Sequence, residues 1–339
     1  MISNEQAASI ATETTNPNAI ALCLSGGGFR ATLFHLGLIR ALRTTTFNGD
    51  MALHAVREVY AVSGGSILAA HFLMNYTRYV DRDDKVFDKV ADELLAFAAS
   101  DLRNRLLRRW PLWAMARTKN PRGELLNLEY ERLLRGRSAT PRGPTIGQCY
   151  AVPGDILTFH FLSTSFTTGA LCSFSRDCFE LMPPGAAKPE MTPADSIPLS
   201  FAVAASSAFP PMFPPVRLTP KMLGTEGQPP FEADIALSDG GVFDNYGIDK
   251  FCLAQRTGAR PGLLIVSNAG GSLATDPTLR FDNIVSRNTR ASEIMMRRVG
   301  ETTISVGKGI VGQGLIDVKI GTTVYVSVVR TFGTDGCVN

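Results

Sequence analysis

Two short apolar segments, each followed directly by small residues and then by a helical pattern, open the ordered part of this sequence. Residues 19–24 lead into three consecutive glycines and then into a helical pattern. Residues 58–62 lead in the same way into Ser63, Gly64 and Gly65, and a second helical pattern follows to about residue 78. Short, uniformly apolar strands are typical of parallel sheets covered by helices on both faces. The repeated strand–turn–helix order therefore predicts an α/β fold with a parallel sheet.

The rest of the chain continues this alternation. Helical patterns cover residues 84–110, 124–135, 199–208 and 282–306, and strand patterns cover residues 156–164, 171–174, 233–238, 262–267 and 322–329. We find no internal repeat and no linker that would divide the chain. We therefore predict a flexible polar leader at residues 1–18 and a single domain at residues 19–339.

Composition narrows the possible partners and the compartment. With 45% hydrophobic and 19% charged residues, the chain is typical of globular proteins, and a net charge of +3 is too small to indicate a nucleic-acid polymer as partner. The six cysteines form no CxxC pair, and the polar N-terminus does not resemble a signal peptide. No apolar run approaches the roughly 20 residues that a spanning helix needs. We expect a cytoplasmic protein whose membrane contact, if any, is peripheral.

Ser63 is the first candidate catalytic residue. It lies between a predicted strand and a predicted helix, and small residues stand two positions before and after it, at Ala61 and Gly65. A nucleophile elbow requires such small residues because the strand and helix approach closely there, although its first position is usually Gly. The alternative is an ordinary turn with a serine that caps the helix.

The glycines at 26–28 are the second candidate element. Three glycines between a strand and a helix leave backbone N–H groups free to face an anion, such as the oxyanion of an acyl-transfer intermediate. Gly26, Gly28 and Ala31 also fit the dinucleotide fingerprint G-x-G-x-x-G/A. That alternative needs an acidic residue at the end of the next strand, where this chain has Val62 and Ser63.

Asp239 is the third candidate, at the end of a predicted strand and before Gly240 and Gly241. An aspartate there can reach a crevice at the strand ends, although many such aspartates only initiate a turn. The chain has four histidines, none within a recognisable catalytic motif. A carboxylate can itself accept the proton of a serine, so the histidines leave Asp239 as the better candidate base.

Taken together and in this order, these motifs resemble the patatin-like phospholipase family. The resemblance covers roughly residues 20–270 and rests on four segments: Ser25-Gly-Gly-Gly-Phe-Arg30, Val62-Ser-Gly-Gly-Ser66, Ala204-Ala-Ser-Ser-Ala-Phe-Pro-Pro211 and Asp239-Gly-Gly241. The first two are also similar to the catalytic domain of cytosolic phospholipase A2. Ala61 departs from the family pattern, which has Gly there, and we expect its single methyl group to be tolerated.

The resemblance implies a three-layer α/β/α sandwich with a mostly parallel central sheet, and a phospholipase A-type hydrolase without metal or cofactor. Such an enzyme cleaves acyl esters of glycerophospholipids through a Ser–Asp dyad and an acyl-enzyme intermediate. Matched by position, the nucleophile is Ser63, the base is Asp239, the oxyanion hole is formed by Gly27 and Gly28, and supporting positions are Gly26, Arg30, Gly64, Gly65, Gly240 and Gly241. The alternative is an inactive lipid- or nucleotide-binding module on the same fold.

A lipid hydrolase must meet a membrane surface, and residues 101–123 are the candidate contact. This window carries seven basic residues, one acid and both tryptophans of the chain. Arginine and tryptophan side by side suit the headgroup boundary; the candidates are Arg105, Arg108, Arg109, Trp110 and Trp113. The alternative is an amphipathic helix pair packed on the sheet with solvated arginines. We expect transient association with membrane phospholipid, under the control of a regulatory ligand or partner that no residue identifies.

Overall fold

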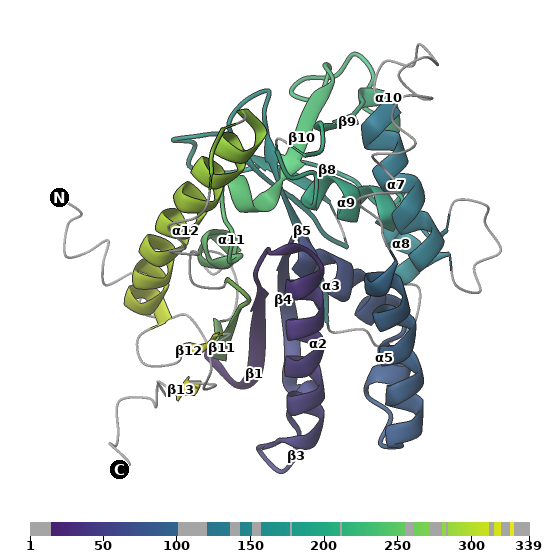
Figure 1. Cartoon of the computed structure of the whole chain (residues 1–339), viewed down its shortest axis with the longest axis vertical. Helices are drawn as coiled ribbons and strands as arrows, with labels where there is room; N and C mark the ends of the chain where they lie inside the picture. Colours follow the sequence, from purple (N-terminus) through teal and green to yellow (C-terminus); the bar gives the residue numbers. More distant parts are fainter. Residues whose placement is uncertain are drawn as a thin grey trace.

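A single large sheet organises the computed structural model, in which the helices lie on its two faces (Figure 1). The structure describes residues 15–100, 121–135, 143–150, 157–176, 178–210, 212–254, 260–270, 280–282, 284–311, 315–319 and 326–328. Within these residues the sheet has 11 strands, in the order β13-β12-β11-β1-β4-β5-β6-β7-β8, with β10 paired to β5 and β9 to β10.

The centre of the sheet is parallel and its flanks are antiparallel. The parallel strands are β12 (Leu315–Lys319), β11 (Arg260–Asn268), β1 (Thr15–Leu24), β4 (Val56–Val62) and β5 (Thr158–Ser165). The antiparallel strands are β6 (Leu171–Phe174), β7 (Phe179–Met182), β8 (Glu190–Thr192), β9 (Val216–Leu218), β10 (Ile235–Asp239) and β13 (Val326–Val328). A separate hairpin joins β2 (Thr46–Phe47) to β3 (Asp50–Met51). The predicted α/β class is confirmed, with parallel pairing confined to the central strands.

Alternate residues of the central strands enter two different cores. In β4, Val59 and Ala61 belong to the larger core, whereas Tyr60 and Val62 belong to the smaller one. Side chains alternate between the two faces of a strand, so a strand buried on both faces needs helices on both. This is the physical reason for the uniformly apolar strand segments in the sequence.

Most of the helices are associated with the larger core. They are α2 (Gly28–Thr44), α3 (Gly64–Met74), α4 (Tyr76–Tyr79), α5 (Asp84–Ala99), α7 (Pro121–Leu134), α8 (Ile146–Cys149), α9 (Leu199–Ser206) and α10 (Pro220–Leu223), with the 3-10 helix η1 (Ala52–Ala55). On the opposite face, α11 (Ile248–Ala254) contributes to the smaller core and contacts α12 (Ile284–Val311).

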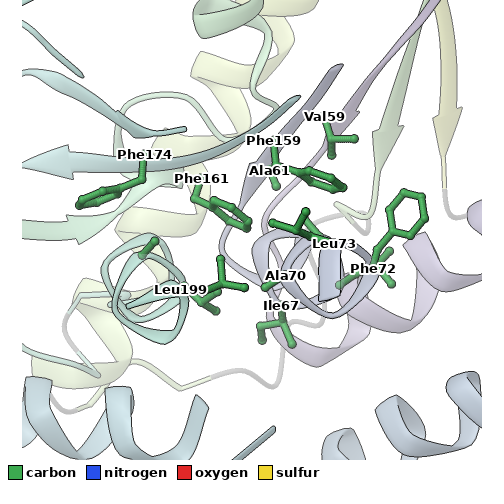
Figure 2. Packing of buried hydrophobic residues seen from close by; sticks show 14 of the residues in the cluster. Val59, Ala61, Ile67, Ala70, Phe72, Leu73, Phe159, Phe161, Phe174 and Leu199 are labelled. Carbon is green, nitrogen blue, oxygen red and sulfur yellow. The ribbon is translucent and has the colours of Figure 1, made fainter. Parts of the chain in front are cut away.

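Aromatic side chains fill the layer between the sheet and the helices α3 and α9. Figure 2 shows Phe159 and Phe161 of β5 facing Ala70 of α3 and Leu199 of α9. Both phenylalanines are at most 1% exposed, and full burial of such a side chain contributes roughly 1.5–3 kcal/mol to folding. This packing fixes α3 and α9 against β5, where the candidate active site is built.

Some predicted boundaries differ from the structure. β1 begins at Thr15, inside the predicted leader, and Thr15 and Asn16 pair with β11. Polar residues such as these carry no hydrophobic signal, so the pattern missed them. The helix predicted over residues 84–110 ends at Ala99, where Ser100 has an extended backbone, and residues 101–110 lie outside the described residues. No helix in the described ranges is long and apolar enough to cross a bilayer.

Candidate active site

Ser63 occupies the sharp turn between β4 and α3. Its backbone has φ 51° and ψ −114°, and among the described non-glycine residues only Asn48 also has a positive φ. A residue with a Cβ in such a conformation is strained by about 1–3 kcal/mol, and strain of this kind concentrates at functional sites. The close approach that requires a small residue at Gly65 is also present, since a Cβ there would lie 2.4 Å from the carbonyl oxygen of Leu24.

The three glycines after β1 lie directly against this turn. A Cβ on Gly64 would lie 2.1 Å from the carbonyl oxygen of Gly28, and the Thr32 hydroxyl donates a hydrogen bond of 2.7 Å to the Gly64 carbonyl. Gly27 and Gly28 have φ of 138° and 61° and are exposed. Because α2 begins at Gly28, the N–H groups of its first turn have no acceptor within the helix. The glycine loop therefore presents exposed backbone beside Ser63, where a developing oxyanion could be stabilised.

Asp239 ends β10 and is 2% exposed. Its Oδ1 accepts a hydrogen bond of 2.7 Å from the Gly241 N–H, whereas its Oδ2 is buried without a hydrogen-bond partner in the described part of the chain. Burial raises the pKa of Asp239 to about 6, and the nearby Ser63 hydroxyl and the Gly241 N–H act in the opposite direction. The Ser63 side chain thus lies beside a carboxylate whose Oδ2 accepts no hydrogen bond in the described structure. This oxygen is therefore free to accept a proton.

The sheet explains why Ser63 and Asp239 meet. Within β5, Leu162 pairs with Val62 of β4, and the next residue, Ser163, pairs with Asp239 of β10. Both residues of β5 also pair with β6 on the other side, so β4 and β10 share one edge. β4 runs parallel to β5 and β10 runs antiparallel to it, so the two strands end facing each other.

Asn245 connects the glycine loop to the turn after Asp239, and the sequence motifs did not single it out. Its backbone carbonyl accepts a hydrogen bond of 3.0 Å from the Gly26 N–H. A Cβ on Gly26 would lie 2.5 Å from Asn245 Oδ1, and a Cβ on Gly241 would lie 2.6 Å from the same atom. Its place in the segment that follows the Asp-Gly-Gly motif is the only sequence signal that could have indicated it.

Each of the four histidines has a hydrogen-bond partner away from Asp239. His35 bonds Ser267 Oγ and the Ser25 carbonyl, His54 bonds Asp50, His71 bonds Tyr79 and His160 bonds Ser173. Burial lowers the pKa of His35 and His71 to about 4 and that of His160 to about 3. These three imidazoles are neutral at physiological pH and are engaged in packing.

A second buried carboxylate near the site, Asp244, has its oxygens occupied. Its Oδ1 accepts hydrogen bonds from the backbone N–H groups of Tyr246 and Gly247, and its Oδ2 accepts one from the backbone N–H of Lys250. Asp244 therefore holds the start of α11 in place, whereas Asp239 keeps an oxygen that can take a proton.

The structure brings most of the predicted site residues together. Around Ser63 and Asp239 lie Gly26, Gly27, Gly28, Gly64, Gly65, Gly240 and Gly241. Arg30 is exposed at the rim of the glycine loop, where its Nη2 would be 3.8 Å from a Cβ on Gly27. The candidate membrane residues Arg105, Arg108, Arg109, Trp110 and Trp113 lie outside the described residues.

Comparison with known protein families shows to which family this chain belongs. The profile of the Patatin-like phospholipase family matches residues 22–251, which is more than half of the chain and includes Ser63 and Asp239. The chain belongs to the patatin-like phospholipase family. Family membership supports lipid hydrolysis as the general activity of this patatin-like protein. A search among curated proteins returned no match.

Solved structures of human GIVD cytosolic phospholipase A2 are similar to this patatin-like chain. One, in complex with a methyl gamma-linolenyl fluorophosphonate inhibitor and terbium chloride, has 18% sequence identity and a TM-score of 0.45, and the similarity covers 74% of this chain and 40% of that chain. Another, in complex with methyl gamma-linolenyl fluorophosphonate, has 17% identity and a TM-score of 0.46 over 87% of this chain and 45% of that chain. This chain therefore spans less than half the length of these structures.

Proposed function

We propose that this chain is a phospholipase A-type acyl hydrolase that cleaves glycerophospholipid esters with Ser63 as nucleophile and Asp239 as base. The observation that carries this proposal is the convergence of β4 and β10 on one edge of β5, which brings the Ser63 hydroxyl to a buried carboxylate. The glycine loop packed on the same turn supplies the third component, a set of backbone N–H groups beside the nucleophile.

The proposed reaction has two halves, the acylation of Ser63 and the hydrolysis of the acyl-enzyme, and each half contains two proton transfers. In the first half, Ser63 Oγ attacks the ester carbonyl while Asp239 Oδ2 accepts the hydroxyl proton. The N–H groups of Gly27 and Gly28 stabilise the negative charge on the former carbonyl oxygen. The C–O bond to the glycerol oxygen then breaks, and Asp239 returns the proton to that leaving oxygen. In the second half, Asp239 accepts a proton from water, which attacks the acyl-Ser63 ester, and returns it to Ser63 Oγ as the fatty acid leaves.

Mass spectrometry of lipids released from mixed phospholipid vesicles tests this function. We expect wild type to release fatty acid and lysophospholipid, and Ser63→Ala and Asp239→Asn each to lose several orders of magnitude in rate, because the two residues act as one unit. A matched serine control is Ser196→Ala, which removes an exposed hydroxyl hydrogen-bonded to the Met222 carbonyl and should keep full activity.

A fluorophosphonate probe separates the enzyme from an inactive binding module on the same fold. The active enzyme should gain one covalent adduct on Ser63, located by peptide mass spectrometry. Full hydrolytic activity in either dyad variant would refute the proposed chemistry. An unlabelled wild type that releases no fatty acid would instead support the binding module.

The proposed substrate also requires contact with a membrane surface. The basic, tryptophan-containing window at 101–123 remains the candidate, since each basic residue near an anionic leaflet contributes about 1 kcal/mol to binding. We expect a Trp110→Ala/Trp113→Ala variant to partition less onto anionic vesicles than wild type, while it hydrolyses a soluble ester normally. Equal partitioning of the two proteins would rule out this window as the contact.

A further inference from the structure

The end of α9 is bonded to the backbone of the candidate nucleophile. Ser206, the last residue of this helix, accepts a hydrogen bond of 3.0 Å on its Oγ from the Ser63 N–H. The same Oγ lies 2.7 Å from Ser66 Oγ in the first turn of α3. Ser206 and Ser66 are fully buried, so water cannot replace these partners.

Two residues further along, the same segment is bonded to the candidate base. The Ala208 carbonyl accepts hydrogen bonds from the Asp239 N–H at 3.1 Å and from the Ser238 hydroxyl at 2.9 Å. The segment from Ser206 to Ala208 therefore holds both Ser63 and Asp239 through their backbone N–H groups. No other described segment is hydrogen-bonded to the backbone N–H groups of both residues.

The rest of α9 is buried against neighbouring elements. It contacts α3, β5 and β10, and all of its residues from Leu199 to Ser206 are buried. Figure 2 shows Leu199 packed among the side chains of α3 and β5. A bond from such a helix can hold a neighbouring turn in a conformation that the turn would not keep by itself.

We propose that Ser206 is a positioning residue, which holds the strained Ser63 turn at the distance from Asp239 that proton transfer needs. This role rests on the proposed function. Ser63 has φ 51°, and its N–H lies outside the hydrogen bonds of both β4 and α3. Without an acceptor at Ser206, the turn can relax and move Oγ away from the carboxylate. A displacement of about 1 Å in reacting groups can reduce a rate by roughly 100-fold.

Three substitutions at Ser206 and one on the same helix test this role. Ser206→Ala removes the acceptor, Ser206→Cys keeps the volume with a much weaker acceptor, and Ser206→Thr keeps the hydroxyl. Ser200→Ala is the matched control, because Ser200 Oγ is also buried in α9 but has no hydrogen-bond partner in the described structure. Thermal unfolding and circular dichroism establish which variants are folded.

We expect Ser206→Ala and Ser206→Cys to lower kcat by roughly 10- to 100-fold with KM changed less than about twofold, since substrate binding is not the step affected. Ser206→Thr should recover part of kcat, and Ser200→Ala should match wild type. The rate of fluorophosphonate labelling of Ser63 should fall with kcat. The acidic limb of the kcat/KM profile should move to higher pH, because the Ser63 hydroxyl, which lowers the pKa of Asp239, is displaced.

Distinct outcomes would overturn this role. An active wild type with unchanged kcat and labelling in folded Ser206→Ala or Ser206→Cys would refute positioning and leave the dyad intact. Loss of activity that only follows loss of thermal stability, with an unmoved acidic limb, would show a packing role and also refute it. A wild type that neither hydrolyses lipid nor is labelled would overturn the proposed function and the positioning role together.

Discussion

Ser63 and Asp239 lie next to each other on one edge of β5, although they are far apart in the chain. Ser63 directly follows the paired residue Val62, whereas Asp239 is itself paired. Val62 pairs with Leu162 and Asp239 pairs with Ser163. A parallel strand and an antiparallel strand can share one edge of a third strand only by ending where they meet. The end of each strand is where a side chain can leave the ladder and face a neighbour, so this meeting point can hold a pair of catalytic groups.

The activity should depend on the ionisation of Asp239. Burial raises its pKa to about 6, and the base must be deprotonated to accept the Ser63 proton. Below pH 6 we expect kcat/KM to increase about tenfold per pH unit, and above pH 6 we expect it to level off. The profile is measured with a soluble ester to avoid changes in vesicle charge. A flat profile between pH 5 and 7, in a protein that remains folded, would exclude Asp239 as the base.

Asp239 should reduce stability at neutral pH. A pKa raised from 3.8 to about 6 means that the folded state holds the proton more tightly than the unfolded state. The protonated carboxyl of Asp239 therefore contributes its full stability below pH 3.8, and this contribution is lost as the pH rises through 6. We therefore expect Asp239→Asn to raise the free energy of unfolding by about 1–3 kcal/mol at pH 8 and by less at pH 5. The amide oxygen of Asn can still accept the Gly241 N–H.

Urea unfolding at both pH values measures this effect. The control is Asp234→Asn, which removes a half-exposed carboxylate paired with Arg217 and should change stability by no more than about 0.5 kcal/mol. A gain for Asp239→Asn that is equal at pH 5 and pH 8 would contradict the linkage to its ionisation.

Gly26 and Asn245 should be energetically coupled in catalysis. A Cβ on Gly26 would meet the flexible end of the Asn245 side chain at 2.5 Å but no other atom closer than 3.4 Å, so Gly26→Ala should fold. The displaced amide also touches Gly241 beside Asp239, so we expect kcat/KM to fall by about tenfold or more. Asn245→Ala should partly restore the activity of Gly26→Ala, with a coupling energy of at least about 1 kcal/mol in a double-mutant cycle. Additive losses would show that the two positions act independently.

Gly65 should tolerate no side chain, in contrast to a glycine in open space. A Cβ on Gly65 would lie 2.4 Å from the backbone oxygen of Leu24, which β1 holds in the sheet. We expect Gly65→Ala to lose more than about 3 kcal/mol of stability or to fail to fold. Gly37→Ala, in α2 with no atom within 4 Å of its Cβ, should gain about 0.5–1 kcal/mol. Equal thermal stability of the two variants would contradict the close approach of α3 to β1.

The sequence patterns were sufficient for elements with strong local signals. The apolar strands and the small-residue turns at Ser63 and Asp239 indicated an α/β fold and identified these two residues as candidates. Local signals failed where polar residues form structure through distant pairing, as at Thr15 in β1. The sequence motifs did not single out Asn245 for the same reason, and they contained Ser206 only within the segment 204–211, because a single serine or asparagine in a loop or at a helix end is common in any protein.

By itself, the sequence determined which residue types could perform the chemistry and where the chain had to turn, because apolar patterns favour strands or helices locally and glycines permit the sharp turns between them. Only the tertiary structure decided which of these residues meet. The pairing of β10 with the edge of β5 beyond the end of β4, the burial that raises the pKa of Asp239, and the hydrogen bond from Ser63 to Ser206 all join distant segments. Such contacts depend on the packing of the whole sheet and its helices, which no local pattern encodes.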